Sequence, residues 1–107
     1  LYSSAASDVY KRQVLFKLKD EASAEEKLAA MNNFKEAIEA LPAKISVIRK
    51  IEVGLNINPA EAWGIALYSE FDTLDDVKFY ATHPEHVAAG KLIAGVKESR
   101  ACVDYED

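Results

Sequence analysis

The chain has 107 residues, and 50% of them are hydrophobic, which suits one compact domain with one core and excludes a multidomain enzyme. Its 18 acidic and 13 basic residues give a formal net charge of -5, whereas a nucleic-acid-binding surface needs clustered Lys and Arg. No apolar run approaches the roughly 18 residues that a membrane-spanning helix requires. We therefore expect a soluble protein with neither nucleic-acid nor membrane partners.

The single cysteine, Cys102, excludes an internal disulfide. It lies in a segment with the alternation of a strand, where a small buried side chain is a more common role for cysteine than a nucleophile. A chain without disulfides is typical of a reducing compartment, so we expect a cytoplasmic protein.

The first 13 residues differ from the rest of the chain. Residues 1–13 are rich in Ser and Ala and lack a sustained period, and a strongly patterned segment begins abruptly at Val14. Residues 8–13 resemble the in-frame translation of a transposon end sequence that is used to build sequencing libraries. We therefore expect a non-native or disordered leader over residues 1–13 and the domain over residues 14–107. A natural disordered extension is the alternative.

A strand and a helix open the predicted domain. Residues 14–19 alternate, with Val14, Phe16 and Leu18 on one face, as in a half-buried strand. Ser23 and Glu26 have the spacing of a capping box, which predicts that a helix begins there. Apolar residues then recur at steps of three and four, and Pro42 ends the helix.

Two more strands follow, and we expect a hairpin between them. Residues 45–55 return to a period of two, residues 54–59 have turn chemistry, and residues 63–71 alternate again. A short helix is predicted after Thr73, and Pro84 suits the first position of another helix. Residues 101–105 supply the last strand.

The resulting order is β-α-β-β-α-β, which predicts an α+β protein with a four-stranded antiparallel sheet and its helices on one face. The opposite face of such a sheet would leave contiguous apolar surface open to solvent. Soluble monomers rarely tolerate that, so we expect a homodimer that forms through the sheet faces.

Residues 79–87 form the strongest candidate for a functional segment, since they hold both histidines of the chain, Tyr80 and Pro84. A helix N-terminus carries partial positive charge, which favours a neutral imidazole that can accept a proton. We expect His83 to cap the helix. His83, Glu85 and His86 give only a weak metal signal because no third convincing ligand is visible, so neither a metal nor a cofactor is expected.

Four segments resemble the stress-responsive A/B barrel (Dabb) family: residues 14–20, the helix end at Pro42, residues 80–86 and residues 103–105. The resemblance runs from about residue 14 to 105. It implies a ferredoxin-like protomer and a homodimer in which two sheets form a barrel, the dimeric α+β barrel.

One branch of this family, the olivetolic-acid-cyclase-like polyketide cyclases, uses a Tyr and a His of the same segment. Tyr80 and His86 match them, which implies that His86 removes a proton beside a carbonyl and Tyr80 binds the developing oxyanion. The reaction would be an intramolecular aldol closure that needs no cofactor. Family members also often carry a His just before the first strand, and Arg12 stands at that position here.

Three hypotheses of different classes therefore stand side by side: a ligand-binding barrel dimer without catalysis, a cofactor-free polyketide-cyclase-like enzyme, and a structural assembly module. His86 is either a general base or a ring packed under the helix start, and Tyr80 is either catalytic or a pocket wall. An apolar pocket with Tyr80 and His86 at its wall would favour the enzyme, and closure of that space by Phe16 and Leu67 would count against it.

Overall fold

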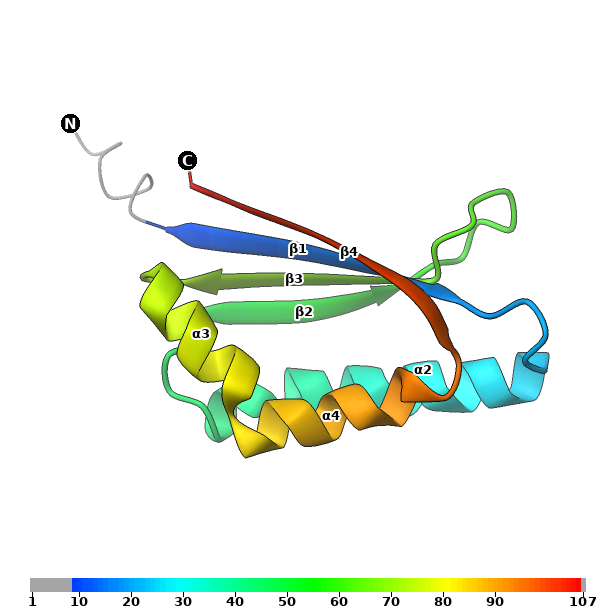
Figure 1. Ribbon diagram of the computed structural model, residues 1–107, viewed down its shortest axis with the longest axis horizontal. Helices are drawn as coiled ribbons and strands as arrows, with labels where there is room; N and C mark the ends of the chain where they lie inside the picture. Colours follow the sequence, from blue (N-terminus) through cyan, green and yellow to red (C-terminus); the bar gives the residue numbers. More distant parts are fainter. Residues whose placement is uncertain (1–8, 107) are drawn as a thin grey trace.

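The computed structural model describes residues 9–106, which fold into one layer of sheet and one layer of helices (Figure 1). The elements in chain order are β1 (Tyr10–Leu18), α2 (Ala24–Glu39), the 3-10 helix η1 (Leu41–Ala43), β2 (Lys50–Leu55), β3 (Ile65–Phe71), α3 (Leu74–Thr82), α4 (Pro84–Ala94) and β4 (Lys97–Glu106). No helix in this part of the chain is both long and apolar enough to cross a membrane.

The four strands form one antiparallel sheet in the order β2-β3-β1-β4. α2 and α4 lie side by side under one face of this sheet, and α3 sits at the end where β1 begins (Figure 1). The predicted β-α-β-β-α-β order and the ferredoxin-like α+β class are confirmed, with the second helical unit divided into α3 and α4.

The core lies between the sheet and the helices, and the predicted alternation supplies it. Val14, Phe16 and Leu18 of β1 are all buried on the inner face of the sheet, as are the alternate residues of β3. From the helix layer, Phe34 and Ile38 of α2 meet them, together with the apolar stripe of α4. One buried layer is thus built from a period of two on the sheet and a period of 3.6 on the helices.

The predicted capping box at the start of α2 is present. The Ser23 hydroxyl accepts a hydrogen bond from the Glu26 backbone N–H at 3.0 Å, and the Glu26 carboxylate accepts one from the Ser23 N–H at 3.3 Å. These two bonds satisfy donors that a helix start would otherwise leave unpaired. The helix therefore begins where the sequence pattern places it.

The first strand begins earlier than expected. β1 starts at Tyr10, so residues 10–13, which the sequence pattern assigns to the leader, belong to the sheet. These four residues lack the apolar alternation that predicts a strand, but each of them pairs with a residue of β3 and a residue of β4. The leader boundary at residue 13 therefore does not coincide with the start of β1, and the prediction for residues 1–8 lies outside the described residues.

The second strand is shorter than expected. β2 covers only Lys50–Leu55, and the residues before it form turns. Ile45 and Ile48 are both buried, three positions apart, and the Ile48 N–H donates to the Ile45 carbonyl at 3.3 Å. Apolar residues in this stretch therefore contribute to the core from a turn, and the alternation of Ile45 and Val47 resembles the start of a strand.

Candidate functional site

The corner between α3 and α4 places both histidines and Tyr80. His83 is extended, with φ -64° and ψ 135°, and is both the C-cap of α3 and the N-cap of α4. Its backbone N–H donates to the Tyr80 carbonyl at 3.2 Å, and its ring Nδ1 accepts from the Glu85 N–H at 3.1 Å. A residue before proline favours this extended backbone, so His83 and Pro84 together set the corner.

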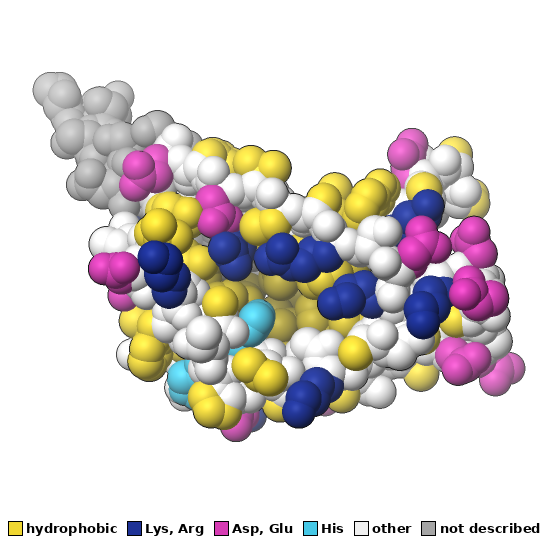
Figure 2. All heavy atoms as spheres, in the orientation of Figure 1, with side chains coloured by type: hydrophobic (Ala, Val, Ile, Leu, Met, Phe, Trp, Pro, Cys, Tyr) yellow, Lys and Arg dark blue, Asp and Glu magenta, His cyan; other side chains and the backbone are white. Residues whose placement is uncertain are grey.

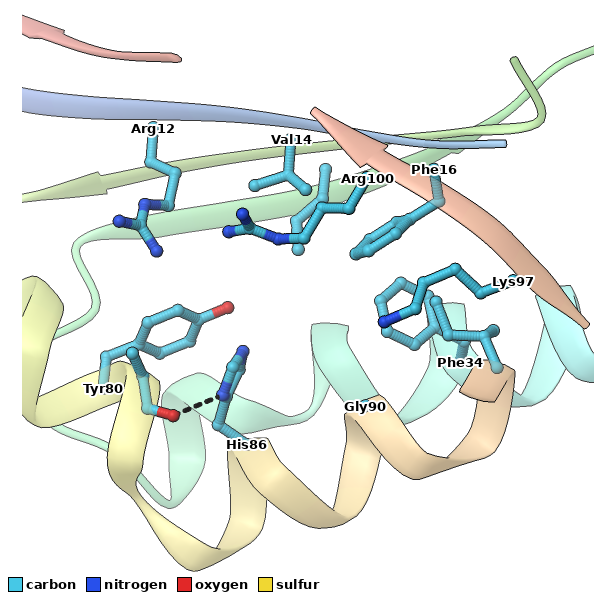
Figure 3. A pocket seen from close by; sticks show the side chains of 12 residues that line it. Arg12, Val14, Phe16, Phe34, Tyr80, His86, Gly90, Lys97 and Arg100 are labelled. Carbon is cyan, nitrogen blue, oxygen red and sulfur yellow. Dashed lines mark hydrogen bonds between the residues drawn. The ribbon is translucent and has the colours of Figure 1, made fainter. Parts of the chain in front are cut away.

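His86 points from the first turn of α4 toward the sheet (Figure 3). Its Nδ1 lies 2.9 Å from the carbonyl oxygen of Ala81. A carbonyl can only accept, so Nδ1 carries the hydrogen, and in the neutral ring Nε2 keeps its lone pair for the interior. Burial lowers the pKa of His86, and the nearby charges of Arg12 and Arg100 act in the same direction, while the Ala81 hydrogen bond opposes them. The ring is therefore a neutral base near pH 7.

Tyr80 stands beside His86, with the two ring centroids 4.3 Å apart. The residue is only 1% exposed, and its hydroxyl has no hydrogen-bond partner within the part of the chain that the structure describes. Burial raises the pKa of Tyr80 to about 12, although Arg12 and Arg100 oppose the shift. The hydroxyl thus stays protonated and can donate to an incoming oxygen atom.

A pocket of about 180 Å³ opens between the inner face of the sheet and the helices, next to these two rings (Figure 3). Phe16 and Leu67 form part of its wall without closing it. The complete lining is Arg12, Val14, Phe16, Phe34, Leu67, Tyr80, Ala81, His86, Gly90, Ile93, Lys97 and Arg100. In the space-filling view the same region is hollowed, with an apolar floor and with His at its lower edge (Figure 2).

The stress responsive A/B barrel domain family, Dabb, matches residues 10–107, which is most of the chain. The chain belongs to the Dabb family. The match also starts at Tyr10, the residue at which β1 begins. No protein with a curated description matches the chain closely.

Solved structures agree with this fold. A dimeric protein of unknown function with a ferredoxin-like fold, from Bacteroides fragilis, is 77% identical, with 94% of this chain and 97% of that chain covered and a TM-score of 0.92. A dimeric ferredoxin-like protein of unknown function from Thermobifida fusca is 21% identical over 92% of this chain and 91% of that chain, with a TM-score of 0.74. The hydroxynitrile lyase from Passiflora edulis is 14% identical over 94% of each chain, with a TM-score of 0.69.

In this Dabb protein, the structure brings Tyr80 and His86 to one pocket wall, where the sequence placed them only on one segment. His83 lies outside the lining, and its Nδ1 is engaged in the cap. Within the described residues, no group of three or more His, Cys, Asp or Glu side chains is arranged to hold a metal. Cys102 is half-buried on β4, and burial raises the pKa of its thiol.

Arg12, which stands where members of the family often carry a His, lines the pocket. On β1 its guanidinium forms a two-point ion pair with Asp104 of β4, with Nε 2.8 Å from Oδ1 and the second nitrogen 3.0 Å from Oδ2. The pair holds the pKa of Asp104 below its usual range. Arg12 thus occupies the pocket rim with its charge already compensated.

Lys97 and Arg100 are two further basic residues of the pocket lining, and the sequence pattern pointed to neither of them. Both precede the apolar alternation at Ala101, so no hydrophobic pattern marked them as part of a strand. Arg100 pairs with Phe16 in the sheet register, and an irregularity between Lys17 and Leu18 places Lys97 opposite Leu18. That bulge turns Lys97 to the same inner face as Arg100, although the two are three positions apart.

Proposed function

We propose that this Dabb protein binds a small, largely apolar molecule in the pocket beneath its sheet. One observation carries the proposal: the buried Tyr80 hydroxyl has no partner among the described residues, and it faces an open pocket with an apolar floor. A buried donor without a partner costs about 1 to 3 kcal/mol, and a ligand oxygen would remove that cost. An engineered apolar cavity of about 150 Å³ binds benzene, so a volume of about 180 Å³ suits a one-ring compound.

Gly90 offers a direct way to test whether this pocket binds ligands. It lines the pocket from α4, and a Cβ added there would meet no atom within 4 Å. Gly90→Leu should therefore fill the pocket and leave the backbone intact. Gly95→Leu is the matched control, because Gly95 also has free space around it but lies outside the lining.

The measurement is the NMR signal of the His86 ring during titration with 4-methylphenol, benzamide and benzoate. We expect saturable shifts in the unmodified protein and in Gly95→Leu, and none in Gly90→Leu. If no compound of the panel moves the His86 signal in the unmodified protein, or if Gly90→Leu binds as well, the proposed function is wrong.

A second candidate function is cofactor-free proton transfer on the bound molecule, as in the polyketide-cyclase-like branch. The observation that favours it is the neutral His86 ring, which is fixed by Ala81 and presents Nε2 to the pocket beside the Tyr80 hydroxyl. His86 would take a proton from the carbon next to a carbonyl, and Tyr80 would donate to the enolate oxygen. In Passiflora edulis a protein with this fold is a hydroxynitrile lyase, so the fold houses catalysis in that plant protein.

The same proposal includes a homodimer that forms through the outer face of the sheet, and a cytoplasmic location. The outer face carries exposed apolar side chains from two neighbouring strands, which are Leu15, Val103 and Tyr105. The 77% identical protein from Bacteroides fragilis is dimeric, and that supports the same assembly here. The free Cys102 supports a reducing compartment.

A further inference from the structure

The walls of the pocket carry only positive charge, although the chain as a whole is acidic. Three of the lining residues are Lys or Arg, and none is Asp or Glu. The chain has 18 acidic and 13 basic residues, so an even spread would place acids there too. Basic side chains follow one another along the upper edge of the hollow, above its apolar floor (Figure 2).

Two of these three charges have no counter-charge. The guanidinium of Arg12 is neutralised by Asp104, as described above. By contrast, neither Lys97 nor Arg100 forms an ion pair with any carboxylate in the described part of the chain. The Lys97 ammonium group lies 5.7 Å from the centre of the Phe16 ring, which holds it over the pocket wall. Both charges therefore remain available to an anion.

The side chains of Arg12 and Arg100 extend from the sheet over Tyr80 and His86 (Figure 3). Their positive field reaches these rings, since each of the two arginines lowers the pKa of both Tyr80 and His86. The two charges without a counter-charge, Lys97 and Arg100, line the same opening, and a bound anion would relieve the repulsion between them. The buried, unpartnered Tyr80 hydroxyl below them independently calls for a ligand oxygen.

We infer that the ligand is a small carboxylic acid in its ionised form, with a one-ring or short aliphatic body that enters the pocket and a carboxylate that Arg100 and Lys97 bind at the rim. The body fits the apolar walls, which include Val14, Phe34 and Ile93. This inference rests on the proposed function and names the ligand class for that same pocket. It depends on Lys97 and Arg100, which are distant in the sequence from the predicted leader over residues 1–13.

Benzoate and benzamide are the probes for this inference, because they share shape and ring but only benzoate is charged at pH 7. Calorimetric or NMR titration of the full-length protein should give a Kd for benzoate about tenfold lower than that for benzamide, the effect of one charge-assisted hydrogen-bonded pair. Arg100→Gln should weaken benzoate about tenfold and leave benzamide unchanged. Lys97→Gln should act in the same direction.

Arg49→Gln is the matched control, since Arg49 is half exposed, pairs with Asp72 and lies outside the pocket lining. It should alter neither Kd. Inorganic phosphate should not displace benzoate, because it lacks an apolar body.

Equal binding of benzoate and benzamide, an Arg100→Gln variant that keeps the preference for benzoate, or displacement by phosphate would each overturn the inference and leave the proposed function standing. If neither benzoate nor benzamide bound but 4-methylphenol did, the inference alone would be overturned; if none of the three compounds bound, both would be overturned.

Discussion

The buried hydroxyl of Tyr80 lowers the stability of the folded protein and, in our proposal, serves ligand binding. A buried donor without a partner destabilises the folded state, and natural cores keep few of them. Here the group lies against a neutral imidazole at the wall of an open pocket. We interpret it as a group whose partner is the ligand.

Tyr80→Phe should therefore leave the free energy of unfolding unchanged or raise it, by up to about 1 to 3 kcal/mol, since the substitution removes an unsatisfied buried group. It should also weaken binding of a carbonyl-containing probe such as benzamide. Urea unfolding and NMR titration measure the two effects. Tyr10→Phe is the matched control: the Tyr10 hydroxyl donates to Asp104 at 2.8 Å, so its loss should cost about 1 kcal/mol. Clear destabilisation by Tyr80→Phe would contradict this interpretation.

His86 is the residue on which the catalytic candidate depends. If it acts as a base, the protein should catalyse exchange of deuterium into the carbon beside the carbonyl of phenylacetone in D₂O, and His86→Gln should lower that rate by about a hundredfold or more. The base must be unprotonated to work. Because burial lowers its pKa, the rate should stay constant down to the ordinary histidine value of 6.5 and fall only below it.

His83→Gln is the matched control for this experiment, because His83 is the other histidine of the chain and lies outside the pocket lining. It should keep the exchange activity. Proton NMR of the ketone follows the reaction directly. Equal rates for His86→Gln and the unmodified protein would exclude His86 as the base. Ligand binding without any exchange would contradict the catalytic candidate and support binding as the function.

At the scale of elements, local chemistry predicts where helices begin better than where strands begin. Ser23 and Pro84 each act within a few residues of their own position, so the starts of α2 and α4 follow from the sequence. Strand ends depend on partners that are distant in the chain. Residues 10–13 and 97–100 carry no apolar alternation, yet both stretches are strand because they lie next to paired neighbours in the sheet.

The corner between α3 and α4 is an element-scale feature that the sequence already explains. His83 closes one helix and caps the next, and the following proline enforces its extended backbone. Tyr80 lies three positions before the cap, and His86 lies three positions after it. A helical turn on either side of an extended residue therefore brings both side chains to the same wall.

At the scale of the whole molecule, the homodimer that we propose forms through the outer face of the sheet. Val103 is 60% exposed on that face, and Tyr105 and Leu15 accompany it. Exposed apolar side chains on one flat surface favour self-association. The helices cover only the other face (Figure 1).

Sedimentation at micromolar concentration should therefore give twice the 11.8 kDa of one chain. Val103→Glu should shift the protein toward the monomer, because it places a charge in the apolar contact. Leu92→Glu is the matched control, since Leu92 is 43% exposed but lies on α4, in the helix layer. A mass near that of one chain for the unmodified protein, or no effect of Val103→Glu, would refute this mode of assembly.

The sequence by itself determined the order of elements and the inner face of β1, because both depend on local periodicity or on capping within a few residues. The resemblance to the family added the ferredoxin-like class and the two rings of the candidate site. Tertiary structure alone decided the charge of the pocket. Arg12, Lys97 and Arg100 meet at one opening because antiparallel pairing and a bulge in β1·β4 turn them to the same face. Pairing between residues 79 to 92 positions apart, from Leu18 and Lys97 to Arg12 and Asp104, leaves no local pattern in the chain.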